Sequence, residues 1–177
     1  MAWTRNVMVF PLLLALLISS TNAIPEDAIN DLCSETQDKD FCLKHIGTDP
    51  RTKAAANLNG VLLVAISQAT NQVIDGSTHI DAIKGGVSDA LGQKRIGVCD
   101  SDYENAHTKF QEAWGKANEG AFMEVINFVR DGTNAVIDCI NVYRRDGPTT
   151  DNPLGYFNQN VFKLSEIILV VNNKLIG

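Results

Sequence analysis

The sequence predicts an all-α protein, an up-down-up-down four-helix bundle preceded by an N-terminal α-hairpin and held by two disulfides. Four long segments carry apolar residues alternately three and four positions apart, which is the period of packed helices. Gly- and Pro-rich stretches separate these segments, and four cysteines stand where they could pair across the predicted turns. With 177 residues, of which 45% are hydrophobic, the chain can bury one core.

Residues 1–23 predict a secretory signal peptide. Arg5 supplies the positive start, Val7–Ile18 form an apolar run, and Ser19–Ala23 end in small and polar residues. The apolar run is shorter than the roughly 20 residues that span a bilayer. We therefore expect cleavage after Ala23 and a secreted domain over residues 24–177, without a membrane partner after cleavage.

Residues 24–49 predict the α-hairpin. Asp27–Cys33 and Asp40–Ile46 have the pattern of short helices joined by a turn at Thr36–Lys39. Asp49 then has the character of an N-cap, and Pro50 suits the first position of a helix. The four-helix bundle is accordingly expected over residues 50–177.

The four bundle helices follow from repeated apolar positions, interrupted at Gly85-Gly86, at 118–120 and at 146–153. Short interruptions between long amphipathic helices favour antiparallel neighbours. The apolar positions are, helix by helix, Leu58, Leu62, Ala65, Ala69, Val73, Gly76, Ile80 and Ile83; Ile96, Cys99, Tyr103, Ala106, Phe110 and Ala113; Phe122, Val125, Val129, Gly132, Val136, Cys139 and Tyr143; and Leu154, Phe157, Val161, Leu164, Ile168, Val171 and Leu175.

The positions of the cysteines favour the pairs Cys33–Cys42 and Cys99–Cys139. The midpoint of the first pair falls in the predicted hairpin turn, and that of the second is Glu119, in the predicted turn between the second and third bundle helices. Residues equally distant from a turn face each other in an antiparallel helix pair, which suits disulfide geometry. A zinc site is the alternative, but the cysteines lack the close spacing that zinc sites use.

The sequence does not predict catalysis, a cofactor or a metal site. The formal charge is −6 and no basic run exceeds two residues, which argues against a nucleic-acid partner. Glu104 and His107 form a single E-x-x-H, whereas di-iron bundles need two such motifs. Trp114 and Phe122 flank the predicted turn at 118–120, either as caps of the core or as contact residues. A binding protein or signalling ligand therefore remains.

Several motifs surround the cysteines. They are Cys33-x2-Thr36-x5-Cys42, Asp49-Pro50-Arg51, Cys99-x3-Tyr103-x2-Ala106, Cys139 at 40 positions after Cys99, and the tail Ile167–Leu175. Together they resemble the plant invertase and pectin methylesterase inhibitor family over essentially all of residues 24–177. The resemblance implies the same hairpin, bundle and disulfide pairing, and a location in the plant cell wall or apoplast. It also implies an inhibitor, not an enzyme, which binds a wall enzyme one-to-one and blocks its cleft.

The resemblance also points to target-binding residues. Invertase-type members carry Pro-Lys-Phe early in the third bundle helix, whereas methylesterase-type members resemble Gly-Asp-Tyr there. This chain has Gly120-Ala121-Phe122, so the missing Pro-Lys favours pectin methylesterase, with acid invertase as the alternative. A diverged bundle acting as an interaction or defence protein, or as a pollen allergen, is the further alternative. The candidate target-binding residues are Glu119, Phe122, Glu124, Asp138 and Asn141.

Overall fold

The computed structural model describes residues 23–177, so the predicted signal peptide lies outside the described residues except for its last position. The described part is helical and contains no strand. None of its helices is both long enough and apolar enough to cross a membrane. The elements are α1 (Glu26–Ser34), α2 (Lys39–Cys42), the π-helical turn η1 (Leu43–Gly47), α3 (Pro50–Lys53), α4 (Leu58–Lys84), α5 (Ala90–Glu119), α6 (Phe122–Arg145) and α7 (Gly155–Ile176).

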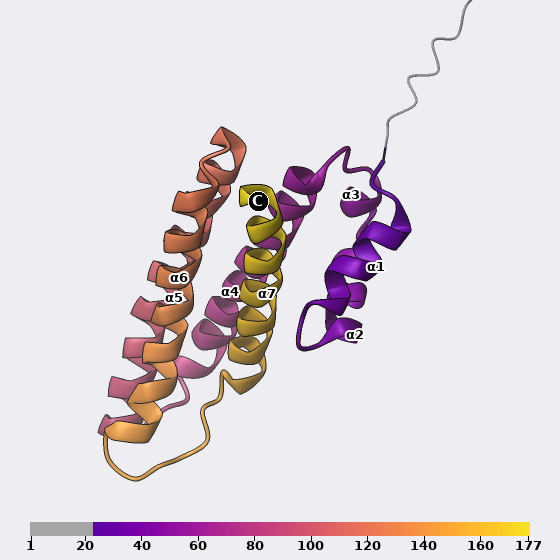
Figure 1. Cartoon of the computed structure of the whole chain (residues 1–177). Coiled ribbons are helices and arrows are strands. Elements are labelled where there is room, and N and C mark those ends of the chain that lie inside the picture. The colour runs from indigo at the N-terminus through magenta and orange to yellow at the C-terminus, as the bar shows by residue number, and fades with distance from the viewer. Residues whose placement is uncertain (1–22) are drawn as a thin grey trace, which may run out of the picture.

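Helices α4 to α7 form the predicted four-helix bundle, and the hairpin lies beside it (Figure 1). Each bundle helix packs against two others: α4 and α6 both contact α5 and α7. Asn57 and Asp89 cap the starts of α4 and α5 by accepting hydrogen bonds from the backbone N–H groups of Gly60 and Gly92. Gly120 ends α5 at a positive φ of 74°, which allows the tight reversal into α6.

The apolar positions predicted for the bundle form its core. All of them are buried except Leu58, Ile83, Phe122, Phe157 and Leu175, which are partly buried against it. Helix α4 shows the least regular pattern because its N-terminal half is covered on additional sides: Val61, Val64 and Ile66 are buried there as well. The sequence pattern therefore identified the inward side of every bundle helix.

The hairpin is joined internally by the Cys33–Cys42 disulfide, while Cys99–Cys139 joins α5 to α6, the pairing expected from the spacing. Its second arm begins as α2 and continues directly as η1 from Leu43 to Gly47. Polar contacts attach the hairpin to α7. They are the ion pairs Lys163–Asp38 at 2.7 Å and Lys174–Glu35 at 2.6 Å, and the hydrogen bond from the backbone N–H of Gln37 to Glu166 Oε1 at 2.8 Å.

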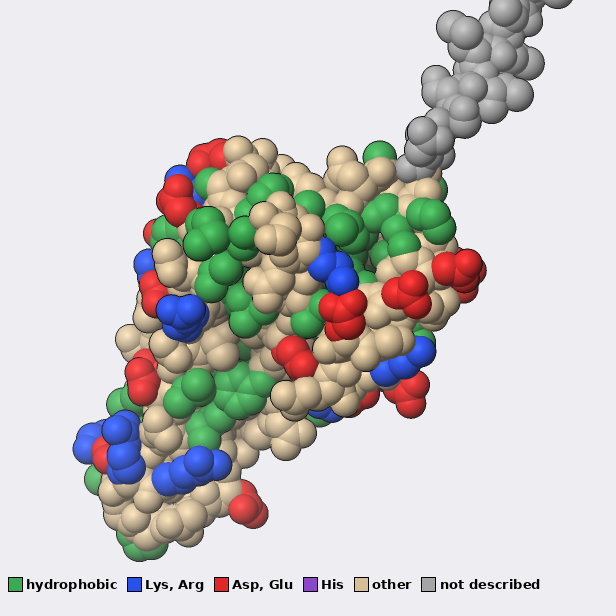
Figure 2. Space-filling model, viewed as in Figure 1, with side chains coloured by type: hydrophobic (Ala, Val, Ile, Leu, Met, Phe, Trp, Pro, Cys, Tyr) green, Lys and Arg blue, Asp and Glu red, His purple; other side chains and the backbone are tan. Residues whose placement is uncertain are grey.

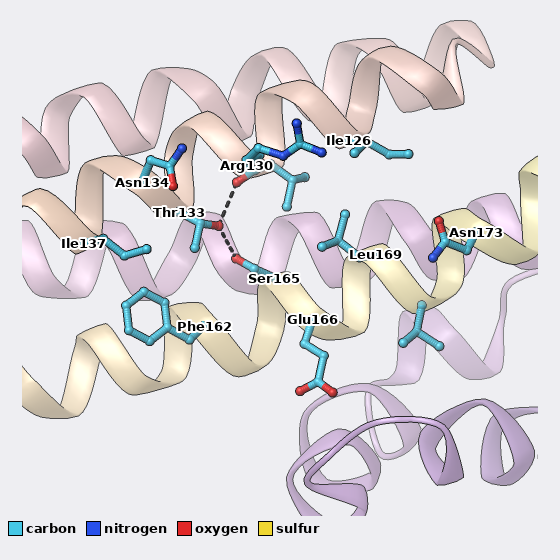
Figure 3. Close-up of a pocket in the computed structure, with 12 residues that line it drawn as sticks. Ile126, Arg130, Thr133, Asn134, Ile137, Phe162, Ser165, Glu166, Leu169 and Asn173 are labelled. Carbon is cyan, nitrogen blue, oxygen red and sulfur yellow. Dashed lines mark hydrogen bonds between the residues drawn. The ribbon is translucent and has the colours of Figure 1, made fainter.

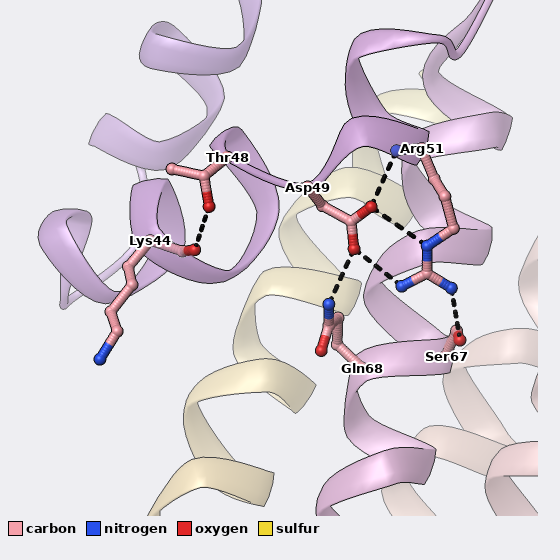
Figure 4. A network of polar contacts seen from close by, with 6 residues as sticks. All are labelled: Lys44, Thr48, Asp49, Arg51, Ser67 and Gln68. Carbon is pink, nitrogen blue, oxygen red and sulfur yellow. Dashed lines mark hydrogen bonds and ion pairs between the residues drawn. The ribbon is translucent and has the colours of Figure 1, made fainter.

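Asp49 connects the hairpin to the bundle (Figure 4). It caps α3 by accepting from the backbone N–H of Arg51, and it also accepts from the Arg51 guanidinium and from Gln68 of α4. The Arg51 hydrogen bond is the main cause that lowers the pKa of Asp49 to about 2. Asp49 and Pro50 occupy the N-cap and the first helical position that the sequence predicted, and the helix that they begin is short. Helix α3 stops at Lys53, and α4 begins separately at Leu58, because Asn57 provides a second cap.

Gly76 of α4 leaves room for a buried side chain of α5. A Cβ atom at this position would overlap the ring of Tyr103, which is fully buried. The Tyr103 hydroxyl donates a hydrogen bond of 2.7 Å to Asn158 Oδ1 on α7. Tyr103 thus contacts one helix with its ring and another with its hydroxyl.

We expect Gly76→Ala to lower the free energy of unfolding by about 2–3 kcal/mol, since the added methyl must displace the Tyr103 ring in a packed core. Gly97→Ala is the matched control, because Gly97 lies inside α5 where an added Cβ would meet no neighbouring atom within 4 Å. That control should be neutral or stabilising by up to about 1 kcal/mol, from helix propensity alone. Urea unfolding of both variants measures the difference, and equal stability of the two would contradict this role of Gly76.

Candidate functional site

Residues 23–177 contain no group of three or more His, Cys, Asp or Glu side chains able to hold a metal ion. Glu104 of the E-x-x-H motif is exposed, and His79 and His45 lie against the rings of Phe157 and Phe41. The candidate sites are the predicted target-binding residues and the hollows between helices.

Three predicted residues lie at the turn between α5 and α6. Lys116 spans this turn, with its Nζ atom 2.9 Å from Glu119 Oε2 and 3.4 Å from Glu124 Oε2. Phe122 is the first residue of α6 and is partly buried, and its carbonyl accepts a 3.0 Å hydrogen bond from Asn172 Nδ2 of α7. Lys116 and Asn172 thus fix the turn to α5 and α7. The carboxylates of Glu119 and Glu124 are both exposed.

The other two predicted residues lie near the far end of α6. Asp138 is exposed and Asn141 is partly exposed. Asp138 lies near Asp102 of α5, whose Oδ2 atom is buried without a hydrogen-bond partner. Burial, and secondarily the charge of Asp138, raises the pKa of Asp102 to about 6.

The structure does not bring the two predicted groups together. Phe122 and Asp138 are 16 positions apart on one helix, a separation of about 24 Å at the α-helical rise. The two groups therefore mark opposite ends of α6. A partner that touches both must cover most of the length of this helix.

Between these ends lies a groove of about 500 Å³ between α6 and α7 (Figure 3). The Oγ1 atom of Thr133 lies 2.9 Å from Ser165 Oγ and joins the two helices along the groove. Arg130 and Glu166 lie beside the apolar lining, and Glu166 also receives the hydrogen bond from the hairpin. The apolar residues of the lining are Ile126, Val129, Ile137, Phe162, Leu169 and Val170.

The groove continues toward the C-terminal end of α6. Phe162 also lines a second hollow of about 560 Å³, which is more polar and includes Arg144, Thr150 and Gln159. Figure 2 shows hydrophobic side chains gathered over α6 and α7, with basic side chains next to them. An apolar centre with a polar and charged edge is the usual composition of a protein-binding surface.

Sequence reasoning missed this groove, although α6 carried a signal for it. Ile126, Ile137 and Ile140 stand outside the predicted core positions of α6 and form a second apolar row. Phe162 and Leu169 do the same on α7. An apolar row beside the core positions indicates either a wider core or an exposed apolar surface, and the 38% exposure of Ile137 shows that this part of the row lies outside the core.

Comparison with known proteins adds two curated relatives from Arabidopsis thaliana. The chain is 49% identical over 164 residues to Pectinesterase inhibitor 5, a match that covers 93% of this chain and 92% of the relative. It is 23% identical over 174 residues to Pectinesterase inhibitor 1, covering 97% and 95% of the two chains. The matches therefore extend over nearly the whole of each protein.

Solved structures show the same fold. A mutant form of a pectin methylesterase inhibitor from Arabidopsis matches with a TM-score of 0.70 at 21% identity, over 82% of this chain and 95% of the other. A second inhibitor structure from Arabidopsis thaliana matches with a TM-score of 0.62 at 21% identity, over 84% and 96%. The model of the plant invertase/pectin methylesterase inhibitor family matches residues 27–171. The chain therefore belongs to the plant invertase/pectin methylesterase inhibitor family.

Proposed function

We propose that this protein inhibits a pectin methylesterase by forming a one-to-one complex with it. The observation that carries the proposal is the 49% identity to Pectinesterase inhibitor 5 over almost the full length of both chains. Invertase is the other target class in the family description. The absence of Pro-Lys before Phe122 supports pectin methylesterase over invertase.

We infer that the protein acts in the apoplast. Residues 1–23 have the composition of a signal peptide, and two disulfides join all four cysteines of the chain. Disulfides of this kind persist in oxidising compartments and are rare in the cytosol. Both features support an encounter with a secreted enzyme of the cell wall.

The surface proposed for the target is the outer side of α6 together with the α6–α7 groove. Glu119, Phe122 and Glu124 lie at one end, Asp138 and Asn141 at the other, and the apolar groove lies between them. Interfaces usually depend on a few central, well-desolvated anchors, while residues at the edge contribute less. We therefore assign the central anchor to the groove and peripheral contacts to the five residues selected from the sequence.

A paired titration tests the proposed function. Oxidised protein comprising residues 24–177 is added to a plant pectin methylesterase and, separately, to an acid invertase. Methanol release should fall linearly and reach its minimum at one inhibitor per enzyme, while sucrose cleavage stays unchanged. Loss of sucrose cleavage alone would assign the protein to invertase, and no effect on either enzyme would contradict an inhibitory function.

Ile137→Asp should weaken inhibition about 100-fold or more, because it places a charge in the apolar centre of the proposed interface. Ile74→Asp is the matched control: Ile74 is similarly exposed, at 42% against 38%, but lies on α4. Glu124→Ala and Asp138→Ala should each weaken inhibition by less than about 10-fold, as peripheral contacts do. Equal inhibition by the two isoleucine variants would exclude the groove as the anchor.

The Asp102–Asp138 pair makes the stability of this side of the bundle depend on pH. The pKa of Asp102 is about 6 when folded, above the ordinary value of 3.8, so the folded state holds this proton more tightly than the unfolded state does. The free energy of unfolding therefore falls as the pH rises from about 4 to 6, and the loss is complete above the folded pKa.

Asp102→Asn should remove this loss, because the amide carries no charge to be desolvated. We expect a gain of about 1 kcal/mol at pH 7, discounted because the carboxyl is partly solvated, or about 2–4 °C in Tm, and no gain at pH 4. Asp138→Asn should give a smaller gain, since burial is the larger cause of the shift. Thermal unfolding at both pH values measures these differences, and the same gain at pH 4 and pH 7 would contradict the raised pKa.

A further inference from the structure

Trp114 is a large exposed aromatic residue that the core does not require. Its side chain lies on α5 and is 45% exposed, while the neighbouring positions Ala113 and Ala117 are fully buried in the core. Of the two interpretations that the sequence allowed, a core cap does not fit this exposure. An indole ring held in solvent on a rigid helix is instead available to a ligand.

The ring of Trp114 borders a hollow of about 340 Å³ between α4 and α5. Its other lining residues are Ser67, Thr70 and Asn71 of α4 and Gln111 of α5. All four are uncharged and polar, and none adds a large apolar side chain beside the indole. The composition differs in this respect from the apolar α6–α7 groove.

The polar groups around the hollow have free hydrogen-bonding capacity of both kinds. Ser67 Oγ accepts from Arg51 Nη1 at 2.9 Å, which leaves the hydroxyl hydrogen of Ser67 available to a ligand acceptor (Figure 4). Thr70 Oγ1 donates to a carbonyl in its own helix at 2.9 Å, which leaves its oxygen lone pairs available to a ligand donor. The amides of Asn71 and Gln111 can each donate and accept.

We propose that Trp114, Ser67, Thr70, Asn71 and Gln111 form a carbohydrate-binding platform for uncharged pyranose rings of a polysaccharide. The C–H groups on one side of a pyranose ring are attracted to the electron-rich face of an indole. The hydroxyl groups at the ring edge need donors and acceptors around that face, and the four polar side chains supply both. A protein anchor would instead favour a dry, apolar surround, which this hollow lacks.

The charges near the platform favour an uncharged ligand over a uronate. The Arg51 guanidinium is paired with Asp49 at 2.7 Å, and Lys116 is paired with Glu119 and Glu124. Neither cation is therefore left unpaired to receive a sugar carboxylate. Methyl-esterified galacturonan and neutral glucan both present uncharged pyranose rings, so both belong to the ligand class.

The platform lies on the opposite side of the bundle from the α6–α7 groove, where we placed the central anchor for the enzyme, and only the peripheral residues Glu119 and Glu124 come near it, through Lys116. The bundle is arranged so that α4 and α6 each contact α5 and α7, which places the α4–α5 side opposite the α6–α7 side. A polysaccharide on the α4–α5 side leaves the α6–α7 groove free for a protein. The platform therefore does not depend on the proposed inhibition, and it would let the protein adhere to a glycan while engaging a partner.

Intrinsic fluorescence offers a direct test, because the chain has two tryptophans and the other, Trp3, lies in the predicted signal peptide. Protein comprising residues 24–177 is titrated with methyl-esterified oligogalacturonides, unesterified oligogalacturonides and a neutral β-glucan oligosaccharide. We expect a saturable fluorescence change with at least one uncharged ligand, and at least 10-fold weaker binding of the unesterified one. Whichever uncharged oligosaccharide gives a saturable signal identifies the polysaccharide that the platform binds, methyl-esterified galacturonan or neutral glucan.

Calorimetry with variants completes the test. Trp114→Ala should abolish binding of the glycan, whereas Tyr156→Ala, which removes a 68% exposed aromatic residue from α7, should retain it. Circular dichroism establishes that both variants are folded. Absence of saturable binding to all three ligands, tighter binding of the unesterified one, or undiminished binding by Trp114→Ala would overturn the proposal. Weaker enzyme inhibition by Trp114→Ala without glycan binding would assign this face to a protein contact and overturn it equally.

Discussion

The ring of Tyr103 lies against the backbone of α4 at Gly76, and its hydroxyl is bonded to Asn158 of α7. One turn earlier on the same helix, Cys99 is joined to Cys139 of α6. Helix α5 is thereby tied to all three other bundle helices within a few residues. The contact requires a residue without a side chain on α4, since a Cβ at this position would overlap the Tyr103 ring. The relative positions of the four helices depend on this small region.

The surface that we propose for the target on α6 follows from how unequally this helix is held by its neighbours. On the α5 side it has a two-residue turn and a disulfide that forbids separation. On the α7 side the connection is the loop from Asp146 to Leu154, and contacts such as Thr133–Ser165 join the helices without filling the space between them. The apolar groove remains open on this looser side. A rigid helix beside an open apolar groove is well suited to receive a partner without large rearrangement.

The hairpin is attached to the bundle by apolar packing and by polar contacts. Its disulfide joins its two arms, and its buried residues, among them Leu32 and Ile46, belong to the same hydrophobic core as those of the bundle helices. Its contacts with α7 include exposed ion pairs, which contribute little each in water. The Asp49 carboxylate is the stronger connection, because it caps α3 while it binds Arg51 and Gln68. The same network orients Ser67, so the junction also shapes the hollow beside Trp114.

The sequence by itself determined the four bundle helices, their inward sides and the disulfide pairing. Apolar period, Gly and Pro interruptions and cysteine positions are local properties, and each acts through the geometry of a single helix or turn. The tertiary structure decided that Ile137 borders an open groove and that Trp114 is exposed. Helical period tells which side of a helix faces inward, but the width of the space between two helices depends on the side chains of both. The candidate surfaces are features of those spaces, and this is why the core could be predicted residue by residue while the binding sites could not.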